Sequence, residues 1–283
     1  MNKAIILLFI SVLYSAQNQR FLYYSKTHGK VEVFALDVTV SGSRFMSYEN
    51  FKIDSLRNLE AEKQFKDQGY YFIKDKELDN VFLTKDYVTK SYPQLQVAYF
   101  TKLGIYSYKV DDSRKIDWQM LPETSVIAGY EVQKAQTEMY GRKWTAWFAP
   151  KIMIQDGPYK FHGLPGLIVK ITDESGDFDY QLFEVKNLKS APNYERSKHR
   201  PKEDKLMGLD YETYKKFFNE NLENPEKFMV AGNIKTNKTV TATGRDKNGN
   251  RITKTMTQEA LNQRMRTILT EKARKTLEKD LLQ

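Results

Sequence analysis

The residues best suited to acid–base or metal chemistry in this chain are its three histidines, His28, His162 and His199. They are far apart in the sequence, and none stands in a spacing such as His-x-x-x-His, which places two imidazoles on one helix face. Cysteine is absent, and this excludes disulfides, thiol catalysis and cysteine-zinc sites. The sequence therefore predicts no metal site and no cofactor.

Neighbouring carboxylates occur at Asp111-Asp112 and at Asp173-Glu174. Two carboxyl groups hydrolyse a glycosidic bond only at a suitable distance in space, and acidic residues in these settings are typical of turns. The chain has no Gly-x-Ser-x-Gly elbow, phosphate-binding loop or dinucleotide fingerprint. No catalytic residue is predicted, and we lean toward a protein that is not an enzyme.

The most distinctive stretch is rich in glycine, proline and apolar residues and runs from Gly157 to Ile168. Pro158 and Pro165 lack a backbone donor and must lie outside the paired part of a strand. Gly163 and Gly166 allow a positive φ or a close approach of another segment, and Leu164 between them is expected to plug the core. Strand pairing should begin directly after Gly166, where apolar residues alternate.

Two interpretations fit this loop: a structural turn that locks two strands, or a rigid loop presented to a ligand or partner. The first is favoured because the apolar run Gly163–Ile168 has no nucleophile, acid or base. The candidate binding residues, should the second hold, are Gly157, Pro158, Phe161, His162, Gly163, Leu164, Pro165 and Gly166, together with Trp144 and Trp147 on the strand before the loop.

The region around this loop reads as a series of short strands from Arg20 to Leu188, separated by turns. The predicted strands are Val31–Val40, Tyr70–Ile73, Val81–Thr84, Leu95–Phe100, Ile105–Val110, Val126–Ala135, Lys143–Ala149, Leu167–Thr172 and Phe178–Val185. Long helices between strands are absent, which argues against a parallel βαβ fold. We predict an α+β fold, predominantly β, with one curved antiparallel sheet that resembles a half-barrel.

The strand Gly141–Pro150 places Trp144, Ala146 and Phe148 on one face and Trp147 on the other. Large aromatics on both faces indicate a central strand. This strand, the glycine-tyrosine strand that ends in Lys134-Ala135, the pair Gly157-Pro158 and the run Gly163–Ile168 together resemble the GLPGLI family of Bacteroidetes. The resemblance covers roughly residues 126–185. One departure is Gln133, where family members often carry cysteine. The family brings no established activity and no catalytic residues.

A few helices are expected beside the sheet. Asp54 or Ser55 could cap a helix from Leu56 to about Lys66, with Leu56, Leu59 and Phe65 as candidates for its buried side. Asp210 could cap a second helix that Pro225 ends. A hairpin is expected at residues 240–254 around Asn248-Gly249, and Thr255–Gln258 has the spacing of a capping box before a final helix at the C-terminus.

The N-terminus has the features of a secretory signal peptide over residues 1–16. One basic residue precedes the apolar run Ala4–Leu13, and small residues follow it. This run is shorter than the about twenty apolar residues of a membrane span. We therefore expect an exported protein, periplasmic or associated with the outer membrane, or secreted. A β-rich core domain is expected at residues 17–188, and a basic, partly helical extension at 189–283.

Almost all of the net positive charge of the chain lies in this extension. The formal net charge is +9; Lys3 contributes one, residues 17–188 carry 23 basic and 23 acidic side chains, and residues 189–283 carry 21 against 13. A basic segment of this kind suits an anionic lipid or an acidic protein surface. No nucleic-acid partner is expected in an exported protein, and peripheral membrane contact through the basic third is one interpretation.

Three functions remain open from the residues. The first is an exported, non-catalytic envelope protein that binds an apolar ligand or a client protein, since an aromatic-rich curved sheet can leave a concave face open. The succession of strands with tryptophan and proline between them is similar to that of periplasmic lipoprotein carriers, and this is an analogy at the level of the fold. The second is an accessory subunit of an outer-membrane or secretion assembly. The third is a peptide or glycan hydrolase, for which the residues offer no support.

Overall fold

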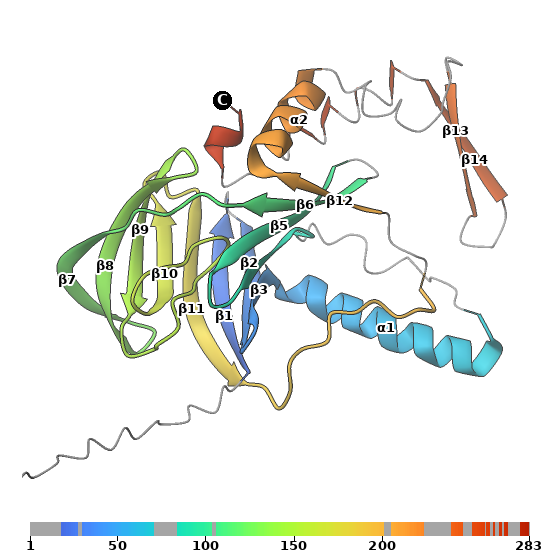
Figure 1. The fold of residues 1–283 in the computed structure, drawn as a ribbon. Helices are drawn as coiled ribbons and strands as arrows, with labels where there is room; N and C mark the ends of the chain where they lie inside the picture. Colours follow the sequence, from blue (N-terminus) through green and yellow to red (C-terminus); the bar gives the residue numbers. More distant parts are fainter. Residues whose placement is uncertain are drawn as a thin grey trace, which may run out of the picture.

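The computed structural model describes residues 18–27, 30–70, 84–103, 106–200, 205–223, 239–245 and 251–257, and near the C-terminus 259, 260, 263, 266, 267, 269, 270 and 278–282. Within these residues, one sheet of 12 strands dominates the chain, with two α-helices, a separate two-stranded hairpin and a short 3-10 helix (Figure 1). The predominantly β character predicted from the sequence is confirmed.

The strands of the large sheet are β1 (Gln19–Thr27), β2 (Lys30–Thr39), β3 (Gly42–Ser47), β4 (Tyr87–Ser91), β5 (Gln96–Leu103), β6 (Tyr106–Asp112), β7 (Gln119–Ile127), β8 (Tyr130–Met139), β9 (Arg142–Ala149), β10 (Leu167–Asp173), β11 (Phe178–Asn187) and β12 (Leu206–Asp210). The predicted range Val126–Ala135 divides at its glycine turn between β7 and β8. The predicted strands Tyr70–Ile73 and Val81–Thr84 lie almost wholly outside the described residues.

The strand order is β12-β6-β5-β4-β3-β2-β1-β11-β10-β9-β8-β7. The predicted antiparallel sheet is confirmed, and the one parallel pair among its described strands is at the edge, where β12 runs parallel to β6. This parallel pairing is possible because β12 follows β11 through a long connection rather than a tight turn.

The connection between β6 and β7 requires the sheet to curl. These strands lie ten intervals apart in the order, which is about 48 Å across a flat sheet. Residues 113–118, which join them, span at most about 25 Å when fully extended. The ends of the sheet must therefore approach each other, and Figure 1 shows β7 to β11 arching as a half-barrel.

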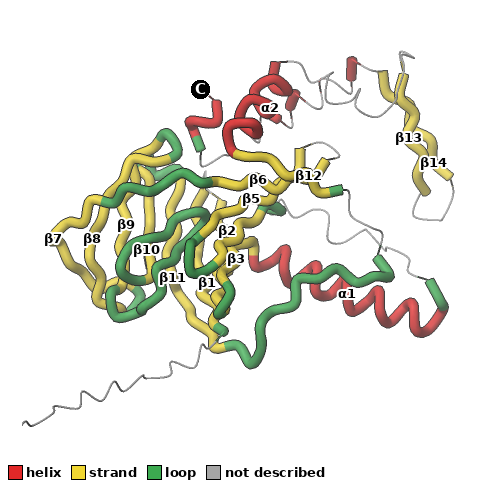
Figure 2. Tube along the Cα trace, in the orientation of Figure 1, coloured by secondary structure: helices red, strands yellow, loops and turns green. Residues whose placement is uncertain are grey.

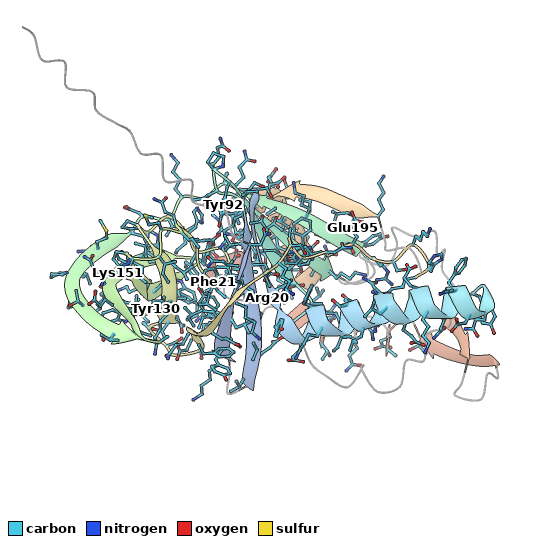
Figure 3. The ribbon with its side chains drawn as sticks, turned by 90° about the horizontal axis from the view of Figure 1, so that it is seen from below. Arg20, Phe21, Tyr92, Tyr130, Lys151 and Glu195 are labelled. Carbon is cyan, nitrogen blue, oxygen red and sulfur yellow. The ribbon has the colours of Figure 1, made fainter. Side chains whose placement is uncertain are left out.

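Helix α1 (Tyr48–Gln68) begins eight residues before the predicted start at Leu56. Its N-cap is Ser47, whose hydroxyl accepts a hydrogen bond from the Asn50 amide at 3.3 Å. The prediction that Leu56, Leu59 and Phe65 face the core is also wrong, because these residues are 60%, 68% and 43% exposed. Helix α1 packs against β2 and β3 only near its start and then projects beyond the sheet (Figure 3).

The segment that follows β11 runs along α1 (Figure 2). The Asn58 side chain donates to the Glu195 carbonyl at 2.9 Å and accepts from the Ser197 amide at 3.1 Å. The Phe65 ring stacks on His199, with centroids 3.7 Å apart. The first part of the basic extension is thus attached to the helix by specific contacts.

Farther along the extension, the predicted cap of the second helix is confirmed. The Asp210 carboxylate accepts the Thr213 amide at 2.8 Å, and α2 (Tyr211–Glu223) follows. The predicted hairpin is also present, as β13 (Thr239–Arg245) and β14 (Arg251–Thr257).

The predicted C-terminal helix is not confirmed. Much of its range lies outside the described residues, as does Pro225, the predicted end of the second helix. The Ala260 amide donates to the hydroxyl of Thr257 rather than to that of Thr255. The described end of the chain is a 3-10 helix, η1 (Lys279–Leu282). The predicted signal peptide also lies outside the described residues. None of the described helices is long and apolar enough to cross a membrane.

Candidate functional site

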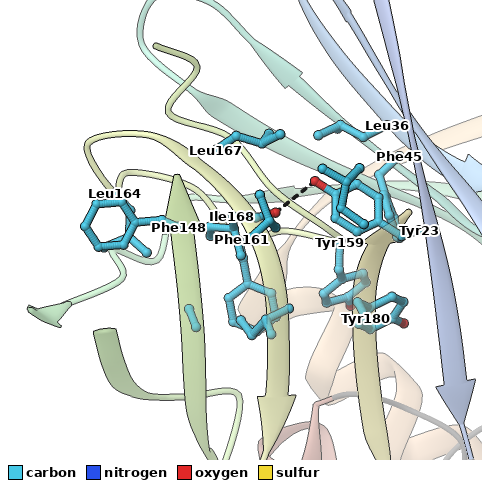
Figure 4. Close-up of a cluster of buried hydrophobic side chains, with 14 of the residues drawn as sticks. Tyr23, Leu36, Phe45, Phe148, Tyr159, Phe161, Leu164, Leu167, Ile168 and Tyr180 are labelled. Atoms are coloured by element: carbon cyan, nitrogen blue, oxygen red, sulfur yellow. Dashed lines mark hydrogen bonds between the residues drawn. The ribbon is translucent and has the colours of Figure 1, made fainter. Parts of the chain in front are cut away.

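The loop between β9 and β10, residues 150–166, packs into the main hydrophobic core of the sheet (Figure 4). The side chains of Phe161 and Leu164 are 0% and 1% exposed. The Phe161 ring lies 4.7 Å from the Trp144 ring of β9, edge to face. The loop therefore supplies the core with side chains and fills space on the inner side of the sheet.

Backbone contacts hold this loop closely against its neighbours. Gly166 has a φ of +154°, and a Cβ placed on it would lie 2.3 Å from the Ala149 carbonyl oxygen. A Cβ on Gly157 would lie 2.7 Å from the Ile168 Cβ. Pairing of β10 begins at Leu167, opposite Ala149, as predicted. This geometry corresponds to a turn that locks β9 and β10.

The predicted binding residues are divided by this packing. Those that are buried are Gly157, Pro158, Phe161, Leu164, Gly166 and Trp144; those that are half-buried are His162 and Trp147; those that are exposed are Gly163 and Pro165. The buried members form part of the core around the loop. The exposed ones carry no functional group that does acid–base chemistry.

A buried lysine and a buried aspartate fasten the loop to β4. The Lys90 ammonium of β4 contacts the Asp156 carboxylate and donates to the carbonyls of Gly157 at 2.7 Å and Phe161 at 3.0 Å. The second carboxylate oxygen of Asp156 accepts the hydroxyls of Ser43 and Tyr92, each at 2.5 Å. Both Lys90 and Asp156 have fully buried side chains.

The electrostatics of this Lys90 cluster keep the carboxylate ionised. Burial alone raises the pKa of Asp156, but the Lys90 ammonium and the donors Ser43 and Tyr92 hold that pKa below its ordinary value. Burial beside this carboxylate raises the pKa of the Tyr92 phenol, which remains a donor. All charges of the cluster are matched, so the cluster is suited to positioning the loop rather than to proton transfer.

A second buried cluster joins the same loop to the C-terminus. The Lys160 ammonium contacts the Glu278 carboxylate and lies 2.8 Å from Asp112 of β6. The Tyr159 hydroxyl donates to Glu278 at 2.5 Å, and the Arg114 guanidinium lies 2.8 Å from the same carboxylate. Glu278 is 3% exposed.

Arg114 forms the outer part of this Glu278 cluster. It binds both carboxylate oxygens of Asp112, at 2.8 and 2.6 Å, and reaches Asp280 at 2.8 Å. Its guanidinium carbon lies 3.3 Å from the centroid of the Tyr211 ring. Burial raises the pKa of Glu278, but Lys160, Arg114 and Tyr159 outweigh that effect and hold it below its ordinary value.

His162, the one histidine in the loop, makes contacts that fix its orientation. Its Nδ1 lies 2.8 Å from the Lys160 carbonyl, and its own carbonyl accepts the Trp118 indole N–H at 2.8 Å. Burial and the Lys90 charge lower the pKa of the imidazole. Among the described residues, no group of three or more histidines or carboxylates could hold a metal ion.

Strand β7 is one of the two edge strands of the sheet, and β12 is the other. Strand β7 is paired with β8, and no other described strand lies beyond it (Figure 3, where Tyr130 and Lys151 mark this end of the sheet). Most of β7 is exposed on both faces, with Met120 at 56% and Val126 at 67%. Pro122 has no backbone donor and the register shifts between Met120 and Thr124, so the regular part of this edge, Thr124–Ile127, is the part that can template another strand.

The hairpin turn determines which groups of β7 face outward. Ala128 and Gly129 have φ values of 52° and 81°, as in a two-residue type I′ turn. The closing pair Ile127–Tyr130 then exchanges both backbone hydrogen bonds, and pairs alternate from there. The N–H and C=O of Val126 therefore point away from β8.

The sequence interpretation missed the charged residues that hold the loop. A signal for Lys90 existed, because it alternates with Val88 on the inner face of β4, and both are buried. Asp156 directly precedes the stretch from Gly157 to Ile168, and Lys160 lies within it. Glu278 had no local signal, because its partners lie more than a hundred residues earlier in the chain.

Comparison with known families gives one short match. A family model described as "Protein of unknown function (Porph_ging)" matches residues 137–170. This segment contains β9, the loop and the start of β10. The match carries neither an activity nor the GLPGLI name. A comparison with curated proteins finds no match.

Two solved structures of PNGF-II, in the space groups P21 and C2, are similar to this chain. Their TM-scores are 0.48 and 0.46, with 15% and 16% sequence identity, and they cover 82% of this chain. The chain spans 36% and 35% of the length of those PNGF-II chains. At these values the likeness carries no argument about function.

Proposed function

We propose that this protein is an exported, non-catalytic binding protein, and that its client is an extended polypeptide segment held at the free edge of β7. Strand addition to an exposed sheet edge is a common mode of peptide recognition. The observation that carries the proposal is the exposed β7 edge, with the backbone groups of Val126 directed outward.

The filled interior favours this client over an apolar small molecule. The loop residues Phe161, Leu164 and Tyr159 belong to the main core and are 8% exposed or less. A ligand on the inner side of the sheet would have to displace these packed side chains, at a cost in free energy. The β7 edge needs no such displacement.

The side chains of β7 provide the specificity that main-chain hydrogen bonds lack. Met120 and Val126 are exposed apolar groups, and apolar side chains on an added strand would pack beside them. Nearby charges alternate in sign, with Glu131 paired to Lys151 at 2.5 Å and Glu123 to Lys134 at 3.4 Å. We infer a client segment rich in β-branched or aromatic residues and low in net charge.

Export rests on the N-terminal pattern, an apolar run followed by small residues. In the proposed role, the protein holds client polypeptides in the bacterial envelope. Fractionation tests this part of the proposal. Recovery of the protein in the cytoplasm with its N-terminal residues retained would contradict it.

The edge is tested by proline substitution at an outward-facing position. In Val126→Pro the lost N–H is one that β8 does not use, so the hairpin should persist while an added strand loses a donor. A photo-crosslinking residue at Met120 would report bound polypeptides in envelope preparations. We expect adducts with the native chain, and a reduction of about tenfold or more in Val126→Pro, since each 1.4 kcal/mol is a factor of ten.

Val126→Thr is the matched control, because it keeps the N–H and a β-branched side chain. It should retain the adducts. Equal labelling of Val126→Pro and Val126→Thr, with both variants folded by circular dichroism, would contradict the edge as the binding site. A complete lack of polypeptide adducts in the native chain would do the same.

A further inference from the structure

Residues 278–282 lie on the rest of the chain in the way a short peptide ligand lies on its receptor. The Glu278 carboxylate receives three donors, Lys160, Arg114 and Tyr159, all from segments more than a hundred residues away. The contact is nearly closed to solvent, since Lys160 and Glu278 have side chains 1% and 4% exposed.

Three further anchors hold the same five residues. The Asp280 carboxylate pairs with Arg114 at 2.8 Å. The Leu281 side chain is 4% exposed in a second apolar cluster formed with β6, α2 and their neighbours. The Lys279 amide also donates to the Tyr140 carbonyl at 2.8 Å. The segment thus offers a carboxylate, a backbone donor, a second carboxylate and a leucine in succession.

The receiving surface is complete without these residues. Four tyrosine rings surround the Lys160 ammonium, with centroids 4.9 to 5.6 Å away: Tyr99, Tyr140, Tyr159 and Tyr211. Lys160 and Arg114 supply two positive charges, and Asp112 supplies one negative charge. The surface is therefore left with one net positive charge when Glu278 and Asp280 are absent. An uncompensated buried charge is costly, so the surface favours an anionic group at the position of Glu278. Asp280 adds a second carboxylate at the more exposed side, where Arg114 and Asp280 have side chains 21% and 27% exposed.

We propose that this surface is a binding site for an acidic peptide segment with a Glu-x-Asp-Leu pattern, and that the chain's own residues 278–281 occupy it as a displaceable internal ligand. The site is separate from the β7 edge and does not depend on the function proposed for that edge. A partner segment of the same chemistry would bind when the internal segment leaves.

The internal segment and an external peptide compete for the same surface, and this competition determines how tightly the external peptide binds. A tethered segment has a high effective concentration at its site. The apparent affinity for an external peptide is reduced by the fraction of molecules whose site is free. Weakening the internal segment should therefore strengthen external binding, which a purely structural contact would not do.

The experiment uses a fluorescent peptide with the sequence of residues 275–283 and the full chain in three forms. The native chain should bind the peptide weakly. A chain with Glu278→Gln and Leu281→Ala keeps the receiving surface, and should bind the peptide about tenfold or more tightly, because a larger fraction of its sites is free. Leu281→Ala alone is the milder variant, in case the double variant does not fold.

Two controls separate recognition from nonspecific attachment. Tyr159→Phe, added to the weakened chain, removes one donor to the carboxylate and keeps the ring, so peptide binding should fall. A peptide with glutamine and asparagine in place of Glu278 and Asp280 should not bind. The proposal is overturned if folded weakened variants bind the acidic peptide no better than the native chain, or if the neutral peptide binds equally well.

Discussion

At the scale of single residues, the informative groups are buried charges rather than the histidines. Lys90 lies in a strand, on the face that contains Val88, and is completely surrounded by oxygen acceptors. An ammonium group can remain in such a position only when each of its donors has a partner. Its acceptors come from the loop, so the lysine links the loop's position to the sheet.

We expect Lys90→Met to destabilise the protein by about 3–5 kcal/mol, because it leaves the Asp156 carboxylate buried without its counter-ion. Urea unfolding followed by tryptophan fluorescence measures the change. Lys143→Met is the control: Lys143 pairs with Glu138 at 3.5 Å with both side chains mostly exposed, and its loss should be small. Equal effects of the two substitutions would refute the role given to Lys90.

At the scale of elements, the loop of residues 150–166 behaves as part of the sheet. It crosses from β9 to β10, places Phe161 and Leu164 in the core and returns through Gly166 into a paired strand. Its two exposed glycine-proline positions, Gly163 and Pro165, lie on the solvent side. The conformation of the loop therefore depends on a few close backbone contacts.

The two motif glycines should respond differently to alanine. Gly163 has a φ of +91° with open space around it, so Gly163→Ala carries the left-handed strain alone, about 1–2 kcal/mol. Gly166→Ala adds a clash with the Ala149 carbonyl of β9 and should cost roughly 3 kcal/mol or more. Thermal melting of both variants tests this order. A larger loss for Gly163→Ala would contradict the close approach at Gly166.

At the scale of the whole molecule, contacts between distant segments hold the curled sheet in shape. The short connection between β6 and β7 brings the two ends of the sheet toward each other. The Glu278 cluster then joins β6, the central loop and the C-terminus through Asp112, Lys160 and Glu278. The three segments are stabilised together, and the carboxylates make that stabilisation dependent on pH.

Acid should unfold the protein through these carboxylates. The pKa values of Asp112, Asp156 and Glu278 lie below their ordinary values in the folded chain, whereas in the unfolded chain they are about 4. Between those values the unfolded state binds more protons, so the free energy of unfolding falls as pH falls. We expect it to be insensitive to these groups above about pH 5 and to decrease through pH 4 and below.

Urea titrations between pH 3 and pH 7 would measure this dependence. Glu278→Gln removes one of the three groups, so its stability should be lower at pH 7 and should depend less steeply on pH below 4. Identical slopes for Glu278→Gln and the native chain would show that Glu278 does not contribute to the acid response.

The sequence by itself determined the β-rich class, the position of most strands, the place of β9 between two other strands and the start of β10 after Gly166. These features depend on alternation, turn residues and proline, all of which act over a few neighbouring positions. The cap at Asp210 and the hairpin β13–β14 were also predictable, because they depend on residues close together in the sequence. The start of α1 was misjudged because Ser47, its actual cap, stands at the end of a strand.

Only the tertiary structure decided how the loop is held and which surfaces remain free. The partners of Lys90 come from the loop, and those of Lys160 come from β6 and the segment at residue 278. No local pattern couples such distant positions. Leu56 and Leu59 are exposed because α1 extends past the sheet that would have covered them. The loop from Gly157 to Ile168 looks like a binding motif in sequence, but burial makes most of it core. The binding surfaces that we propose are the edge of β7 and the surface that holds Glu278.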